Sequence, residues 1–180
     1  CAVAAQAIRR ATAAAPVRLT LVERRGALGE GIAYGTQEDF HRLNVPAAKM
    51  SLWPDQPEDF LRWAQRRDPN VGPTDFLPRP WYAEYVRDSL LAAARANAAA
   101  AQLSVAFDEV RRIARHPGGG WLVHLGRGPS LRTRAVVLAV GHRPPTNPLE
   151  GVWTGPRQRF LADAWRPFAM NAVRNDEPVV

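Results

Sequence analysis

Cysteine is nearly absent from this sequence, because Cys1 is the only one among 180 residues. A disulfide framework is therefore excluded, and a reducing compartment is favoured. No apolar run reaches the length that spans a bilayer, and the alanine-rich N-terminal segment carries its arginines behind its apolar part, unlike a signal peptide. We therefore expect a cytoplasmic protein that does not engage a membrane.

Lysine is also scarce, since Lys49 is the only one and arginine supplies nearly all of the positive charge behind the net +7. These arginines are scattered as singles and pairs, which is typical of a solvated surface rather than of a groove for phosphates. We therefore expect a small-molecule substrate and no nucleic-acid partner. A clustered basic stripe in the structure would reverse that expectation.

Histidines with metal-ligand spacing are lacking as well. The chain holds four histidines, and the single cysteine does not complete a metal site with any of them. No pair of a nucleophile and a base can be identified, so the sequence predicts no metal site and leaves the catalytic residues unassigned. The histidines are His41, His116, His124 and His142.

A short apolar strand that ends on an acid is the most informative feature present. Residues 19–22 are apolar or β-branched and lead directly into Glu23. In dinucleotide-binding folds an acid about 20 residues beyond a glycine fingerprint accepts hydrogen bonds from the adenosine ribose. Counting back from Glu23 places that fingerprint at or just before Cys1, and residues 1–15 form an alanine-rich crossover helix closed by Pro16. We therefore expect the chain to begin inside the first helix of a nucleotide-binding domain and to lack the first phosphate loop.

The glycines after Glu23 do not replace that loop. Gly26, Gly29, Gly31 and Gly35 have the spacing G-x-x-G-x-G, which differs from the phosphate fingerprint, and no helical period follows them. We interpret them as a flexible loop that lets backbone approach a ligand closely, with an ordinary glycine-rich turn as the alternative.

The irregular segment 40–54 comes next and is rich in Asn, Lys, Met and Trp. Such residues can surround a flat aromatic ligand and reach its polar edge, although a packed loop would have the same composition. Helices are predicted at 55–67, with Phe60, Leu61 and Ala64 facing inward, and from Trp81 to about Ala101, with its aromatic residues in the core.

A three-strand antiparallel meander is predicted in the remainder. Its strands are 103–113, 121–125 and 131–140, separated by glycine-rich turns. Since residues 135–140 are wholly apolar, we expect the last strand to leave the meander and enter a buried parallel sheet. The turn at 141–145 would then lie at the ligand-binding edge, which makes His142 a candidate by position.

Several of these segments resemble the FAD-NAD(P)-binding family of flavoprotein oxidoreductases, which are similar to the flavin-containing and N-hydroxylating monooxygenases. The sequence departs from the family pattern at Val140, where Thr is commoner, and in lacking the first phosphate loop. The matching segments are Glu23–Arg25, Gly29–Gly35, Leu43–Ser51, Pro57–Trp63 and Val137–Pro145.

The resemblance implies which residues bind the cofactor. Glu23 would bind the adenosine ribose of FAD, Asn44, Lys49 and Met50 would lie toward the flavin, and the Val110 backbone would meet the adenine. The implied cofactor-binding residues are Glu23, Arg24, Gly29, Gly31, Asn44, Lys49, Met50, Val110, Gly141 and His142.

We therefore predict an α/β protein with a Rossmann-like FAD/NAD(P)-binding fold: a parallel sheet, crossover helices and an inserted antiparallel β-meander, truncated at both ends. Residues 1–150 would form the FAD-binding domain, and residues 151–180 would be a linker into a second nucleotide-binding region for NAD(P)H. The expected function is the FAD-binding portion of an NAD(P)H-dependent, monooxygenase-like oxidoreductase, inactive as this fragment alone. The alternatives are an NAD(P)-only dehydrogenase domain and a non-catalytic, Arg-rich module that binds nucleic acid.

Overall fold

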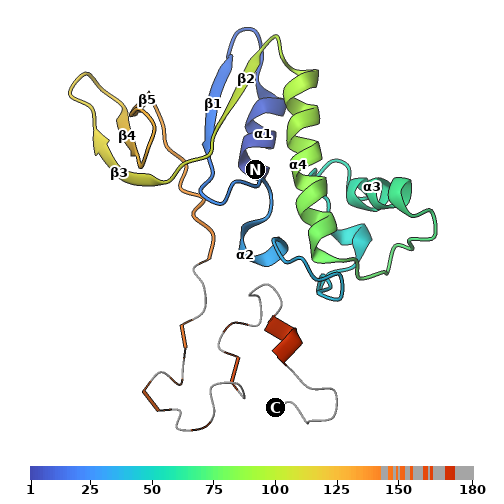
Figure 1. Cartoon of the computed structure of the whole chain (residues 1–180). Coiled ribbons are helices and arrows are strands. Elements are labelled where there is room, and N and C mark those ends of the chain that lie inside the picture. Colours follow the sequence, from blue (N-terminus) through green and yellow to red (C-terminus); the bar gives the residue numbers. More distant parts are fainter. Residues whose placement is uncertain are drawn as a thin grey trace.

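Two sheets and a helical layer make up the described part of the chain in the computed structural model (Figure 1). One sheet is the parallel pair β1–β2, and the other is an antiparallel sheet of order β3–β4–β5. The mixed α/β class and the antiparallel meander are thus confirmed. The strands are β1 (Val17–Val22), β2 (Ala101–Ala106), β3 (Val110–Arg115), β4 (Trp121–Leu125) and β5 (Leu131–Thr133). The structure describes residues 1–142, 146–147, 149, 151–152, 155, 160–161, 163 and 169–172.

A long crossover joins the two parallel strands, which pair in register from Val17 opposite Ala101 to Val22 opposite Ala106. The helix before β1, α1, and the helix before β2, α4, pack on each other and against these two strands. The meander β3–β5 lies on the other side of the β1–β2 pair (Figure 1). The helices are α1 (Ala2–Arg10), α2 (Gly31–Tyr34), α3 (Asp59–Arg67) and α4 (Arg79–Ala96), with 3₁₀ helices η1 (Ala47–Lys49) and η3 (Ala169–Ala172).

The first helix ends earlier than its composition predicted. Ala11 is already extended, and Pro16 disfavours helical geometry at Ala15. The Thr12 hydroxyl accepts a hydrogen bond from the Ala15 amide at 3.1 Å, which closes a tight turn into β1. The chain therefore reverses direction between α1 and β1.

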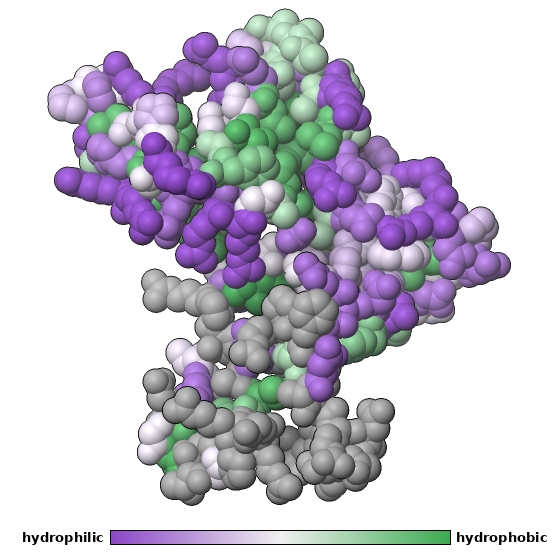
Figure 2. All heavy atoms as spheres, viewed as in Figure 1, coloured by the Kyte–Doolittle hydropathy of each residue, from purple (hydrophilic) through white to green (hydrophobic). Residues whose placement is uncertain are grey.

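The strand β1 is half-buried, whereas the sequence predicted a fully buried parallel strand. Leu19 and Leu21 pack against the core, but Arg18 and Thr20 on the opposite face are exposed. In the part of the chain that the structure describes, α1 and α4 cover one face of the pair, so alternate residues remain in water. Figure 2 shows hydrophilic residues over the meander and hydrophobic ones gathered over the neighbouring strands.

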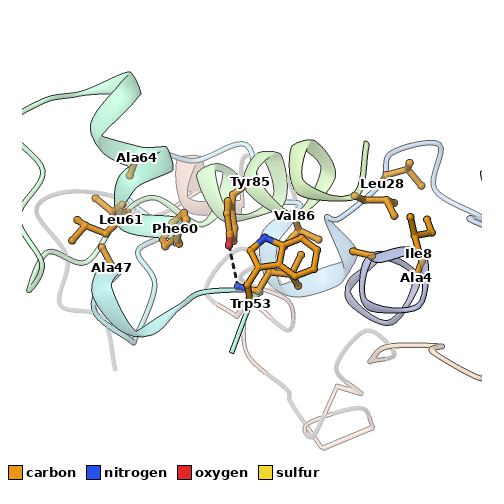
Figure 3. Close-up of a cluster of buried hydrophobic side chains, with 14 of the residues drawn as sticks. Ala4, Ile8, Leu28, Ala47, Trp53, Phe60, Leu61, Ala64, Tyr85 and Val86 are labelled. Carbon is orange, nitrogen blue, oxygen red and sulfur yellow. Dashed lines mark hydrogen bonds between the residues drawn. The ribbon is translucent and has the colours of Figure 1, made fainter. Parts of the chain in front are cut away.

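The core between α3 and α4 agrees with the helical periodicity of the sequence. Phe60, Leu61 and Ala64 are buried as expected, and Phe60 contacts Tyr85 with ring centroids 5.0 Å apart. Figure 3 shows Tyr85 between Phe60 and Trp53. Burial among these rings also raises the pKa of Tyr82 to about 12. The aromatic residues of α4 are therefore packing residues, as predicted.

We expect Tyr85→Phe to destabilise this layer by about 1–3 kcal/mol. The Tyr85 hydroxyl donates to Asp59 Oδ2 at 2.8 Å and accepts from the buried Leu52 amide at 3.0 Å, so its removal leaves a buried donor without a partner. Denaturant unfolding of both proteins measures the loss. A variant as stable as the wild type would show that water replaces the hydroxyl.

The predicted strand 103–113 is wrong as a single element. The structure divides it into β2, which pairs with β1, and β3, which begins the meander. A turn centred on Asp108 separates them, and Asp108 is buried at 7% exposure. The polar pair Asp108–Glu109 is therefore a break between two sheets.

The predicted strand at 135–140 is also wrong. β5 ends at Thr133, and Val137, Leu138 and Val140 are exposed by 66%, 71% and 87%. An apolar run forms a buried strand only when a neighbouring strand pairs with it, and among the described residues β1 pairs with β2 alone. The parallel sheet is therefore smaller here than expected.

The C-terminal predictions lie mostly outside the described residues. Beyond His142, the end of the predicted turn at 143–145 and the strand expected at 176–180 are outside them, as is most of the linker motif 162–167. No helix in the described ranges is long and apolar enough to cross a membrane.

Candidate cofactor-binding site

Glu23 lies at the carboxyl edge of the parallel pair, as the sequence predicted. Its amide donates to the Ala106 carbonyl at 2.9 Å, which places it beside the end of β2. Its Oε1 accepts the Arg25 amide at 2.8 Å, and Oε2 makes no hydrogen bond with the described residues. The carboxylate is thus held by its own turn and keeps one oxygen for a ligand.

The N-terminus of α1 lies at the same edge, because α1 reverses into β1 (Figure 1). Glu23 acts electrostatically on the Cys1 amino group, whose pKa is lowered by burial and partly restored by the Glu23 charge. The Glu23 carboxylate thus lies beside the first helix, and in dinucleotide-binding folds an acid at this position accepts hydrogen bonds from a ribose.

Arg24 and Val110 are brought to this edge as well. The Arg24 guanidinium lies 3.7 Å from Glu109 Oε1, which links the end of β1 to the residue before β3. Val110 opens β3 and is 37% exposed. The structure therefore gathers Glu23, Arg24 and Val110 around one edge.

The glycine loop is more ordered than predicted. Gly29 has φ +87°, and a Cβ there would lie 2.6 Å from the Ala83 carbonyl oxygen of α4. The backbone of Gly29 therefore packs closely against α4. A contact between Gly29 and the cofactor stays a prediction. Gly31, with φ +54° and open space around it, begins the short helix α2 in a segment expected to lack helix.

The segment that holds Asn44, Lys49 and Met50 is irregular apart from η1, as expected. The Asn44 and Lys49 side chains are exposed and make no hydrogen bond or ion pair with described residues, while Met50 packs partly into the core. Both polar groups are thus available to a ligand.

This segment continues along α1. The Gln6 side-chain amide donates to the Leu52 carbonyl at 2.9 Å, and Arg9 pairs with Asp55. The contacts run parallel to the helix, so residues 52–55 follow α1 in its own direction. Lys49 lies in η1, which packs against α3. How Asn44 and Lys49 are placed relative to Glu23 stays a prediction.

No described strand carries Gly141 and His142 to the carboxyl edge of the β1–β2 pair. Both are exposed, and Gly141 has φ +66° with no atom within 4 Å of a Cβ position. Because residues 135–140 do not pair, the predicted route by which Gly141 reaches the cofactor is wrong. Their contact with a cofactor stays a prediction.

Asp108 and Glu109 were missed as neighbours of the site. They interrupt the apolar alternation between β2 and β3, and this interruption was the available signal. Both lie where the chain leaves the carboxyl end of β2.

A family model described as FAD-NAD(P)-binding matches residues 1–143, a range that contains every predicted site residue. A comparison with curated proteins finds no match. The family indicates that FAD and NAD(P)H are the cofactors. With Glu23 at the carboxyl edge of the parallel pair and this match over most of its length, the chain belongs to the FAD-NAD(P)-binding family.

Proposed function

We propose that this chain is the FAD-binding portion of an NAD(P)H-dependent flavoprotein oxidoreductase with monooxygenase-like chemistry. The observation that carries the proposal is the place of Glu23 at the carboxyl edge of a parallel pair, beside α1, with Oε2 making no hydrogen bond among the described residues. An acid at that position serves a ribose, and a dispersed arginine surface does not require it.

The residues present fit the two ends of an FAD molecule. At the sheet edge, Glu23 Oε2 would accept from the ribose hydroxyls, and the Val110 backbone would meet the adenine. In segment 40–54, the exposed Asn44 amide and Lys49 ammonium would reach the polar edge of the ring system. FAD, when bound, supplies the ring that exchanges a hydride with NAD(P)H.

Lys49 and Asn44 would stabilise negative charge on the bound ring system. A cationic or amide donor fixed beside a ring stabilises the negative charge that develops on it, provided that water is kept away. Met50, half-buried next to Lys49, supplies an apolar side to that position. The electrons would pass onward to a small-molecule substrate or to oxygen.

We expect the full-length protein, purified from cells, to be yellow and to show flavin absorbance. Denaturation should release FAD, identified by its fluorescence and mass. A colourless preparation that takes up no FAD but binds NAD(P)H would support an NAD(P)-only dehydrogenase domain. Strong, salt-sensitive DNA binding without flavin would support the nucleic-acid module, because phosphate contacts release counterions.

A further inference from the structure

Asp108 forms a compact junction between the parallel pair and the meander. Its side chain is buried at 7% exposure between β2 and β3. Oδ1 accepts the Glu109 amide at 2.7 Å, while Oδ2 accepts the Arg127 and Gly128 amides at 3.0 and 2.7 Å. One carboxylate thus fixes its own turn and the β4–β5 turn.

The surrounding chain is fitted to this carboxylate. A Cβ at Gly126 would lie 3.1 Å from Asp108 Oδ1, and the Gly126 amide donates to the Glu109 carbonyl at 2.8 Å. Arg127 lies 3.8 Å from Oδ1 through Nε and donates through Nη2 to the Phe107 carbonyl at 2.9 Å. Hydrogen bonds from the Gly128 and Glu109 amides hold the pKa of the Asp108 carboxyl below its usual value, so the group is ionised at neutral pH.

The junction is joined directly to the edge that holds Glu23. The Ala106 carbonyl accepts the Glu23 amide at 2.9 Å and the Asp108 amide at 3.0 Å. The Arg24–Glu109 ion pair makes a second connection between the two turns. A shift of Asp108 would therefore move the acceptor of Glu23 and the start of β3 together.

We propose that Asp108 is a positioning residue for the adenosine half of the cofactor, because its carboxylate sets the Glu23 turn and the Val110 backbone at a fixed separation. It touches no ligand and acts through Ala106 and Glu109. This inference rests on the proposed function, and it adds a residue outside the segments that resemble the family.

The test compares ADP-ribose binding in the full-length wild type and in its Asp108→Asn and Tyr85→Phe variants, well below their melting temperatures. Asparagine places an NH2 donor against backbone amides that also donate, so we expect the dissociation constant for ADP-ribose to rise about tenfold. Tyr85→Phe removes a hydroxyl that is bonded to Leu52 and Asp59 and not to the Asp108 junction, so it should lower the melting temperature and leave ADP-ribose affinity unchanged. A general loss of stability would affect both variants alike.

Each outcome decides the inference. If wild type binds ADP-ribose and Asp108→Asn binds it equally well, the positioning role is overturned while the proposed function stands. If wild type binds neither ADP-ribose nor FAD, both are overturned. Should Asp108→Asn fail to fold, Gly126→Ala replaces it: its Cβ presses on Oδ1 and must weaken ADP-ribose binding in the same direction, or the role is overturned.

Discussion

Glu23→Ala is expected to weaken FAD binding by roughly one to two powers of ten. The variant removes hydrogen bonds to an ionised acceptor, which contribute ~1.5 to 3 kcal/mol. Glu23 Oε2 makes no hydrogen bond among the described residues, and it lies at the edge where Val110 also lies. Titration of the apo-protein with FAD, followed by flavin fluorescence, measures the change.

Asp39→Ala is the matched control for Glu23→Ala. It removes the same charge from an exposed position on the same crossover, where the structure shows no ion pair among described residues. FAD affinity should be unchanged in this variant, and the apo melting temperatures of both variants should stay near wild type. If Glu23→Ala keeps its FAD affinity while its apo melting temperature collapses, Glu23 is a structural acid and β1 is not the cofactor strand.

Gly29→Ala is expected to be among the most destabilising single changes in the chain. Its φ of +87° alone costs a non-glycine residue about 1–2 kcal/mol. The new Cβ would also meet the Ala83 carbonyl oxygen at 2.6 Å, and relieving such a clash against backbone adds about 1–3 kcal/mol. Urea unfolding of wild type and variant gives the difference.

Gly26→Ala separates these two costs. Gly26 has nearly the same φ, +82°, but nothing lies within 4 Å of its Cβ position. It should therefore lose the conformational part alone, about 1–2 kcal/mol. Equal losses in the two variants would mean that α4 moves away from Gly29 at little cost.

Local patterns in the sequence predicted the parts of the fold that are decided locally. The spacing of Phe60, Leu61 and Ala64 gave the buried face of α3, because helical periodicity needs no knowledge of partners. The strand that ends on Glu23 was predicted from another local pattern, a short apolar run followed by an acid. Its placement at the carboxyl edge followed from the geometry of parallel strands.

Features that depend on distant partners were missed. The run 135–140 is wholly apolar, unlike β1 with its Arg18 and Thr20, and whether such a run pairs depends on which strand edge it meets. Likewise, nothing near Gly29 in the sequence announces the Ala83 carbonyl. The two hydrogen bonds that Asp108 accepts from the Arg127 and Gly128 amides were also missed, because they join residues on either side of the β3–β4 hairpin.

The long crossover between β1 and β2 has a consequence for the order of folding. The Asn97 side-chain amide donates to the Ile8 and Ala11 carbonyls, which are 89 and 86 positions away. We expect such contacts to form late in folding, because closing a long loop costs conformational entropy before the contacts can stabilise the chain. The edge that carries Glu23 exists only after β1 and β2 have paired, so a cofactor bound there stabilises an interaction absent from the early folding nucleus. We therefore expect bound cofactor to slow the unfolding of the domain and to leave its folding rate nearly unchanged.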